Sequence, residues 1–185
     1  MSDSMSMSNN KGYITLIIGP MFSGKTTELI RLIKRATIAG KKCVVVKYDK
    51  DIRYGDELHT HDLVEYIASY KCNDLNQLQE IYKEYDVIAI DEGSFIKNIN
   101  MVDEWANNGK IIYISALDAD FNRNPFANIT NLIAKTEVII KLSAICKCGE
   151  NASFTYRKND NVNLEVIGGS EIYNALCRTC YNKLL

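Results

Sequence analysis

The stretch Tyr13-Ile-Thr-Leu-Ile-Ile18, followed by Gly19-Pro-Met-Phe-Ser-Gly-Lys-Thr26, decides the fold of this chain. The first part is apolar and rich in β-branched residues, which favours a short buried strand. The second part fits the pattern G-x-x-x-x-G-K-[ST], a glycine-rich loop whose backbone N–H groups surround phosphates. Residues 27–39 then place apolar side chains at helical spacing, and Gly40 supplies a stop signal. The sequence therefore predicts a strand, a phosphate-binding loop and a helix in the order that nucleotide binding requires.

Each part of the loop has a use in holding ATP. Gly19 and Gly24 let the backbone approach phosphate, Lys25 can reach the outer phosphates, and the Thr26 hydroxyl suits Mg²⁺. Neighbouring Thr27 is interpreted as a helix-start residue. A glycine-rich turn with a surface lysine is the alternative, but it does not explain why motif and context agree. The remaining loop residues predicted to bind ATP are Pro20, Met21, Phe22 and Ser23.

Short apolar runs continue along the chain and alternate with helical patterns. We expect strands at residues 43–47, 87–90 and 110–115 and a helix at residues 75–82. Residues 48–74 give an ambiguous signal, interpreted as a loop region with some helix. Apolar strands separated by helices are typical of a parallel sheet covered on both faces. The predicted fold class is therefore α/β, a P-loop NTPase (RecA-like) parallel sheet with helices on both faces.

Two carboxylates, Asp91 and Glu92, end the predicted strand at residues 87–90. P-loop proteins present an acid to Mg²⁺ at the carboxyl edge of the sheet, which makes Asp91 the expected metal-associated residue. Glu92 could take a proton from an attacking hydroxyl in a transferase, or orient water in an ATPase. A third reading is that the pair merely caps the next element. The pattern alone does not separate these alternatives.

Four of the six cysteines form two close pairs, Cys146-Lys-Cys148 and Cys177-Arg-Thr-Cys180, separated by 28 residues. Two pairs of thiolates are typical of a structural Zn²⁺ ribbon, which leaves no open position for catalysis. A redox dithiol and independent reduced cysteines are the alternatives. We expect three parts in the chain: a disordered tail at residues 1–11, a P-loop core at residues 12–144 and a small zinc-binding domain at residues 145–185.

Composition narrows the range of partners. The chain has 185 residues, with 22 Lys+Arg against 23 Asp+Glu, a net charge of -1 and a pI near 6.1. This balance argues against a protein that mainly neutralises nucleic acid or an anionic membrane. No apolar run approaches the length of a membrane span, and residues 1–10 lack the features of a secretory signal. We therefore predict a cytoplasmic protein with reduced thiols and no nucleic-acid or membrane partner.

A few residues remain open to two readings. His59 and His61 could bind a metal but are more simply solvated in a polar loop. Arg53 and Arg123 lie in predicted loops, where they either face solvent or contact phosphate. The aromatic residues Phe121, Phe154 and Tyr173 lie in polar segments where a ring could stack on a nucleobase.

The order of P-loop, acidic pair and cysteine pairs resembles the cytosolic-type thymidine kinase family over nearly all of residues 12–181. The motifs that carry the resemblance are Gly19-Pro-Met-Phe-Ser-Gly-Lys-Thr-Thr-Glu-Leu29, Asp51-Ile-Arg53-Tyr54, Thr60-His-Asp62, Asp91-Glu-Gly-Ser-Phe95, Ala116-Leu-Asp118, Phe121-Asn-Arg-Asn-Pro-Phe126, Phe154-Thr155-Tyr-Arg157, Glu165-Val-Ile-Gly-Gly169 and Tyr173 before Cys177-Arg-Thr-Cys-Tyr181. The resemblance implies transfer of the γ-phosphoryl group of ATP to the 5′-hydroxyl of thymidine or deoxyuridine. It also implies feedback inhibition by thymidine triphosphate and a homotetramer.

The resemblance also assigns roles to residues. Glu92 matches the catalytic base and Asp91 the Mg²⁺-associated carboxylate. Asp51 and Arg53 match a segment near the phosphates, and Gly93 and Ser94 are also predicted to bind ATP. Those matching the nucleoside pocket are Phe95, Leu117, Phe121, Thr155 and Tyr173, with Thr155 near the 5-methyl group. Those matching the zinc-anchored lasso loop that closes over the base are Leu164, Glu165, Val166, Ile167 and Gly168.

The chain departs from the family pattern at three places. Ser94 replaces the usual Gln, Asp118-Ala-Asp120 replaces Asp-Gly-Thr, and the first cysteine pair is one residue short. Two other functional classes compete with a nucleoside kinase. A RecA-like ATPase would use Glu92 to activate water, and a non-enzymatic zinc-ribbon module would not need Lys25.

Overall fold

A six-stranded sheet forms the centre of the molecule, in the order β3-β2-β4-β5-β1-β6. The computed structural model describes residues 11–50, 68–158 and 168–184. Every neighbouring pair of strands in this sheet is parallel, which confirms the predicted fold class. The strands are β1 (Tyr13–Ile18), β2 (Cys43–Tyr48), β3 (Ala68–Cys72), β4 (Val87–Ile90), β5 (Ile111–Ala116) and β6 (Val138–Lys141).

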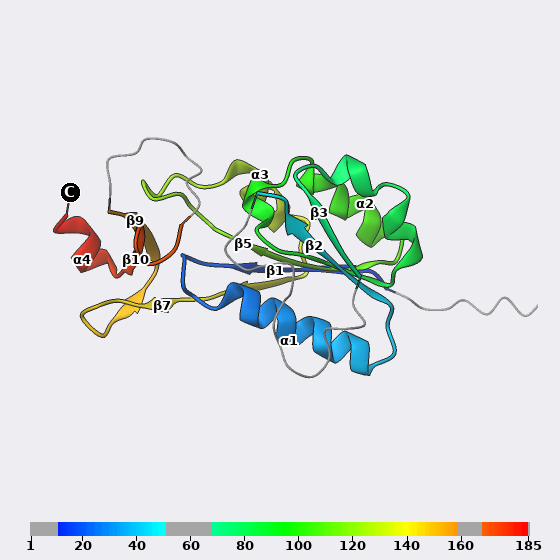
Figure 1. Cartoon of the computed structure of the whole chain (residues 1–185), viewed down its shortest axis with the longest axis horizontal. Coiled ribbons are helices and arrows are strands. Elements are labelled where there is room, and N and C mark those ends of the chain that lie inside the picture. The colour runs from blue at the N-terminus through cyan, green and yellow to red at the C-terminus, as the bar shows by residue number, and fades with distance from the viewer. Residues whose placement is uncertain (1–10, 51–67, 159–167, 185) are drawn as a thin grey trace, which may run out of the picture.

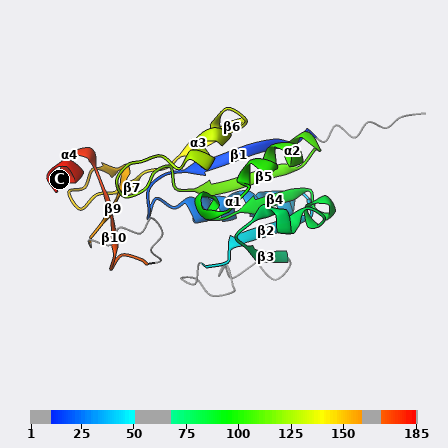
Figure 2. The same cartoon turned by 90° about the horizontal axis from the view of Figure 1, so that it is seen from above.

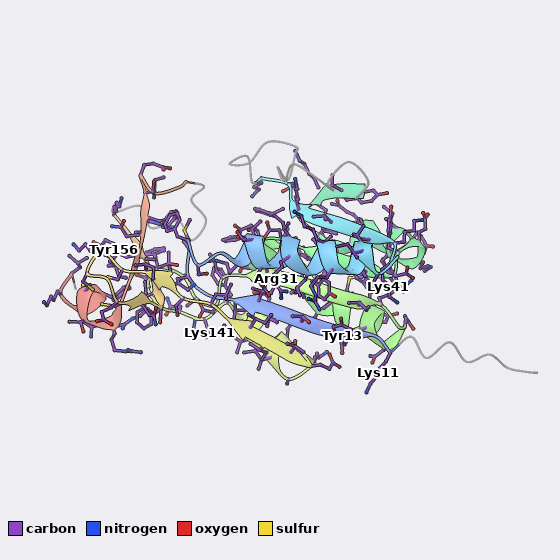
Figure 3. All side chains as sticks on the ribbon, turned by 90° about the horizontal axis from the view of Figure 1, so that it is seen from below. Lys11, Tyr13, Arg31, Lys41, Lys141 and Tyr156 are labelled. Carbon is purple, nitrogen blue, oxygen red and sulfur yellow. The ribbon has the colours of Figure 1, made fainter. Side chains whose placement is uncertain are left out.

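Helices cover both faces of the sheet, as Figures 1 and 3 show. Helix α1 (Lys25–Ile38) packs Leu29 and Ile33 onto one face, the face seen in Figure 3, where Arg31 is labelled on α1. The opposite face is covered by α2 (Val102–Asn107) and α3 (Ala127–Ile133). Side chains alternate across each strand, so Leu16 packs into one core and Ile17 into the other. Within the described residues, no helix combines the length and apolar character needed to cross a bilayer.

The structure differs from the predicted secondary structure in two regions, residues 75–82 and residues 48–74. The helix predicted at residues 75–82 is wrong, because the structure has two separate 3₁₀ turns, η2 (Leu75–Leu78) and η3 (Ile81–Glu84). Asp74 starts η2 by accepting a hydrogen bond from the Asn76 N–H at 2.9 Å. Leucines at i and i+3 are both buried, and this spacing fits a 3₁₀ turn as well as an α-helix. The ambiguous region contains strand β3, which pairs with β2 at the edge of the sheet.

Beyond the carboxyl ends of the strands lies a smaller unit, which we call the C-terminal module and define as residues 144–158 and 168–184 (Figures 1 and 2). Its antiparallel pairs are β7 (Ala144–Ile145) with β8 (Asn151–Ala152) and β9 (Phe154–Arg157) with β10 (Tyr173–Leu176), followed by α4 (Arg178–Asn182). A separate cluster of buried residues, which includes Cys146 and Cys177, forms its core.

Candidate active site

The loop between β1 and α1 has a backbone that only particular residues allow. Gly19 has φ +153°, and a Cβ there would lie 2.4 Å from the Leu142 carbonyl oxygen. Gly24 has φ +82° and forms the N-cap of α1, so the helix begins at Lys25 rather than near Thr27. The Lys25 ammonium donates to the Pro20 carbonyl oxygen at 2.7 Å, as does the Ser23 hydroxyl at 2.8 Å. The predicted phosphate-binding loop is therefore held by hydrogen bonds to its own main chain, and it lies at the start of a helix, where anions bind.

Asp91 lies directly after β4, and its carboxylate accepts hydrogen bonds from three segments of the chain. The Thr26 hydroxyl donates to its carboxylate at 3.2 Å, and the Glu92 N–H donates at 3.1 Å. The Ser115 hydroxyl, which is buried, also donates to Asp91. The structure thus brings together Thr26 and Asp91, the two residues expected to associate with Mg²⁺.

Ser115 is a site residue that the sequence analysis missed. It lies next to the end of β5, beside β4, in a strand of otherwise apolar side chains. Parallel strands end at the same edge of a sheet, so a polar residue at this position could have been paired with Asp91 in advance.

Glu92 has a left-handed backbone, with φ 54° and ψ 39°. Left-handed conformations are uncommon for residues other than glycine and cost of order 1–3 kcal/mol, and they concentrate at functional sites. Glu92 is followed by η4 (Gly93–Phe95), which packs tightly, because a Cβ on Gly93 would lie 2.7 Å from the Ile114 side chain. The site therefore holds Glu92 in a strained position at the edge of the sheet.

Ser94 and Phe95 connect this edge to the predicted nucleoside residues. The buried Ser94 hydroxyl accepts a hydrogen bond from the Leu117 N–H at 2.7 Å and donates to the Leu117 carbonyl oxygen at 3.2 Å. Phe95 lies between two rings, with centroids 5.6 Å from both Tyr48 and Phe126. The Ser94 side chain is thus engaged with Leu117, and Phe95 is part of an aromatic cluster.

Thr155 joins the C-terminal module to the phosphate loop. Its hydroxyl oxygen accepts a hydrogen bond from the Met21 N–H at 3.0 Å, and the side chain is buried. Met21 and Thr155 are 134 residues apart in the sequence. A residue expected to contact a nucleoside therefore touches the loop expected to hold ATP.

Phe121 and Tyr173 meet through a third residue, Arg157. The Arg157 guanidinium carbon lies 3.8 Å from the Phe121 ring centroid, and its Nη2 donates to the Tyr173 hydroxyl at 2.9 Å. The Tyr181 hydroxyl donates to the Phe121 carbonyl oxygen at 2.5 Å. Arg123, for which solvent and phosphate were the two readings, instead lies over the Tyr181 ring at 4.6 Å.

The four paired cysteines form a compact cluster. Their Sγ atoms all lie within 4.8 Å of one another, and Cys148 Sγ is 3.7 Å from Cys177 Sγ. Zn–S bonds of about 2.3 Å in a tetrahedron separate sulfur atoms by about 3.8 Å, so the cluster fits Zn²⁺. Hydrogen bonds from the backbone at Cys148 and Cys177 lower the pKa of Cys146 to about 6, which favours a thiolate ligand. Thiol hydrogen bonds to its three neighbours raise the pKa of Cys180 to about 12. The short C-x-C pair therefore does not prevent the sulfur atoms from converging.

The predicted site residues of the lasso and of the segment after β2 lie mostly outside the described part of the chain. Gly168 begins the described segment that leads into β10. The predicted site residues outside the described part of the chain are Asp51, Arg53, Leu164, Glu165, Val166 and Ile167, together with His59 and His61.

Comparisons with known proteins give consistent family matches over most of the chain. The profile of a family described as thymidine kinase matches residues 12–181. The thymidine kinase of Yaba monkey tumor virus is 48% identical over 180 residues, which cover 96% of this chain and 99% of the relative. The thymidine kinase of rabbit fibroma virus is 48% identical over 172 residues, covering 92% and 96% of the two chains. That of vaccinia virus, strain Western Reserve, is 47% identical over 174 residues, covering 93% and 98%.

Proposed function

The chain belongs to the thymidine kinase family, and on that premise we propose that it transfers the γ-phosphoryl group of Mg·ATP to the 5′-hydroxyl of thymidine or deoxyuridine, giving dTMP from thymidine. The observation that carries this proposal is the hydrogen bond from the Met21 N–H to the Thr155 hydroxyl. It joins the proposed nucleoside pocket to the proposed phosphate loop. A P-loop that only hydrolysed ATP would have no need of such a junction.

We assign the phosphates to the loop and its surroundings. Backbone N–H groups of residues 19–26 would surround the phosphates, and the Lys25 ammonium would exchange its contact with the Pro20 carbonyl for an outer phosphate. The proposed further contacts near the phosphates are Asp51, Arg53, Gly93 and Ser94. Catalysis of this kind consists mainly of positioning and charge neutralisation.

The proton is assigned to Glu92. The carboxylate would accept the proton of the 5′-hydroxyl as the oxygen attacks the γ-phosphorus, and the bond to the β,γ-bridging oxygen breaks. The left-handed backbone of Glu92 supports this role, because strain of this kind is kept where geometry matters for chemistry. Enclosing the nucleoside would exclude water from the same position.

The residues at the edge of the sheet fit a Mg²⁺ site. The Thr26 hydroxyl and the Asp91 carboxylate lie 3.2 Å apart, and both are oxygen donors of the type that Mg²⁺ prefers. We propose that Thr26 and Asp91 hold the ion, with Asp91 binding directly or through water. When bound, Mg²⁺ neutralises charge on the phosphates. The four cysteines would hold a structural Zn²⁺ that stabilises the C-terminal module.

The nucleoside is assigned to the face between η4 and the C-terminal module. Its proposed contacts are Phe95, Leu117, Phe121, Thr155 and Tyr173, with the lasso segment Leu164, Glu165, Val166, Ile167 and Gly168. Thymidine triphosphate would inhibit by placing its base there and its phosphates on the loop. We also propose that the chain consists of a P-loop core at residues 12–144 and a zinc-held domain at residues 145–185; the disordered tail predicted at residues 1–11 falls almost entirely outside the described part of the chain.

Assembly and location are also proposed from family membership. Val138 and Ile139 are 44% and 43% exposed on the edge strand β6, which supports burial against another copy in a homotetramer. Sedimentation velocity tests the proposed homotetramer, because a protein that sediments as a monomer would contradict it. The net charge of -1 supports a protein that binds neither nucleic acid nor membrane, and the reduced thiols support a cytoplasmic location.

One assay tests the function. The purified protein is incubated with Mg·ATP and with each deoxynucleoside in turn, and the products are separated by chromatography. We expect monophosphate from thymidine and deoxyuridine and little phosphate release without a nucleoside. Lys25→Met is the control, because it removes the ammonium that reaches the phosphates. Rapid ATP hydrolysis without any nucleoside would instead identify an ATPase, and the absence of turnover in both the wild type and Lys25→Met would identify a binding module.

A further inference from the structure

A tight loop at residues 119–125 carries Phe121 between β5 and α3. The Asp120 carboxylate fixes its backbone by accepting hydrogen bonds from the N–H groups of Asn122 and Asn124, both at 2.8 Å. Ala119 and Pro125 form a bridge at the base of the loop. Contacts within the loop thus fix the conformation of its backbone. The orientation of the half-buried Phe121 ring depends instead on contacts from outside the loop.

Arg157 supplies the contact to the ring. It lies in β9 and is only 5% exposed, with its guanidinium carbon 3.8 Å from the Phe121 ring centroid. Its Nη2 donates to the hydroxyl of Tyr173, which is also 5% exposed and lies in β10. A desolvated guanidinium against an aromatic face is strongly attracted, and its planar shape restricts how the ring can tilt. One buried cation therefore contacts two rings of the proposed nucleoside pocket.

Tyr181 supplies the contact to the main chain. Its hydroxyl donates to the Phe121 carbonyl oxygen at 2.5 Å, and its side chain is 3% exposed. Tyr181 follows Cys180 in α4, the helix whose N-cap is Cys177. The cysteine cluster thus fixes the helix that holds Phe121.

From these contacts we propose that Arg157 and Tyr181 are positioning residues, which fix the ring and the main chain of Phe121 so that its side chain presents a preformed surface to the thymine base. This inference rests on the proposed function. Neither residue needs to touch the nucleoside, because both act through Phe121. A preformed surface strengthens binding because less side-chain freedom is lost when the base arrives.

Two variants separate this role from general stability. Arg157→Lys keeps the charge but removes the planar group and the fork that reaches the Tyr173 hydroxyl. Tyr181→Phe keeps the ring and removes only the hydroxyl that holds Phe121. Arg178→Lys is the matched control, because exposed Arg178 lies 4.8 Å over the Phe154 ring in the same module but has no described contact with Phe121.

The measurements are thymidine affinity by calorimetry, the KM for thymidine and for ATP, kcat, and zinc content, all on the full chain. For Arg157→Lys we expect a thymidine KM and Kd about tenfold higher, because the variant loses the planar stacking on Phe121 and the fixed hydrogen bond to the Tyr173 hydroxyl, with kcat, the ATP KM and zinc content unchanged. Tyr181→Phe should shift the same two constants in the same direction, and Arg178→Lys should shift neither.

The outcomes distinguish the inference from the function it rests on. Unchanged thymidine binding in Arg157→Lys and Tyr181→Phe would overturn the inference and leave the kinase proposal standing. Parallel losses of kcat, ATP affinity and zinc would overturn it as well, because they indicate a purely structural role. If Arg157→Lys does not fold, Tyr181→Phe decides alone. A wild-type protein that neither binds nor phosphorylates thymidine would overturn both proposals.

Discussion

Asp91 is the residue that connects the elements around the proposed phosphate site. Its carboxylate accepts hydrogen bonds from Thr26, Ser115 and the Glu92 N–H, which come from the start of α1, the end of β5 and the turn after β4. These donors fix the orientation of the carboxylate before any ligand arrives. The adjacent Glu92 receives its position from the same turn, so the proposed metal-binding acid and the proposed base for the proton are consecutive residues.

The Glu92→Gln variant tests the base. The amide keeps the shape of the side chain but cannot take a proton, so we expect kcat to fall by about 10²–10⁴-fold with nearly unchanged binding of ATP and thymidine. Steady-state kinetics and calorimetry measure the two effects. Glu84→Gln, which changes an exposed carboxylate in η3, is the control and should behave as wild type. A Glu92→Gln variant with normal turnover would remove Glu92 from this role.

The Ser115→Ala variant tests the support of Asp91. Hydrogen bonds to charged groups contribute about 1.5–3 kcal/mol, so we expect the Mg²⁺ concentration for half-maximal rate to rise by about tenfold or more. Calorimetry should show weaker binding of Mg·ATP and unchanged binding of ATP without the metal ion. Exposed Ser143 provides the matched control, Ser143→Ala. Equal losses with and without Mg²⁺ would mean that Ser115 supports the loop rather than the metal-associated carboxylate.

At the scale of elements, the connection between β1 and α1 depends on two glycines for different reasons. Gly19 faces backbone, with the Leu142 carbonyl oxygen 2.4 Å from an added Cβ, whereas Gly24 faces open space. Both have positive φ, +153° and +82°. Gly19 therefore lets two parts of the chain approach, and Gly24 lets the chain turn into the helix.

Alanine at each glycine gives a matched comparison by urea unfolding of the protein without ligand. Gly24→Ala should lower the free energy of unfolding by about 1–2 kcal/mol, the cost of a left-handed alanine. Gly19→Ala should lower it by more, because the backbone at Leu142, directly after β6, must also move away from the loop. Equal effects at the two positions would show that a clash with Leu142 adds nothing to the loss in the free energy of unfolding.

The sequence predicted the central elements of the sheet better than its edges. Strands β1, β2, β4 and β5 are runs of buried apolar residues, so their pattern alone reveals them. Edge strand β3 alternates with the polar residues Ser69 and Lys71, so it gives no continuous apolar run. Edge strand β6 has only three consecutive apolar residues, Val138 to Ile140, against four in β4, and the sequence analysis did not identify it. The η2 and η3 turns were predicted as one helix because burial at i and i+3 does not distinguish a 3₁₀ turn from an α-helix.

For the candidate site, the sequence predicted the residues that belong to local motifs but not the contacts between distant parts of the chain. Motif residues such as Lys25, Thr26 and Asp91 follow from spacing, because the loop and the strand end recur at a fixed place in such sheets. The contact between Met21 and Thr155 joins residues 134 positions apart, and no local pattern encodes it. Arg157 was visible in the sequence, but its burial between aromatic rings depends on how the C-terminal module folds.

At the scale of the whole molecule, the core and the C-terminal module have separate sources of stability. The sheet rests on two large apolar clusters, whereas the module has a small cluster built around cysteines. With the proposed Zn²⁺ bound, a segment of that size would gain much of its folding energy from the metal. The two parts are therefore expected to respond differently when the metal is lost.

The Cys177→Ser variant tests this separation. Serine keeps an N-cap oxygen for α4 but removes a metal ligand, so the loss reports on the metal rather than on the cap. We expect lost zinc, proteolysis within the module and a higher thymidine KM. Trp105 is the single tryptophan and is buried beside Tyr82 in the core, so its fluorescence should still report a folded sheet.

The control for this variant is Cys43→Ser, which changes a buried cysteine on β2. It should retain zinc and instead lower the temperature at which the Trp105 signal is lost. Full zinc content in Cys177→Ser would contradict the proposed metal site. Simultaneous loss of the Trp105 signal would contradict the independence of the two parts.

The parallel pairing of β1 has a consequence for folding during synthesis on the ribosome. β1 is synthesised early, yet its neighbours come much later: its partner residues lie 98 positions further along the chain in β5 and 123 positions further in β6. Until they emerge, a nascent chain carries an apolar strand with no partner on either side, which is a target for chaperones and for aggregation. Slower translation or a destabilised β5 should therefore reduce the soluble yield of this protein in cells more than its refolding from denaturant.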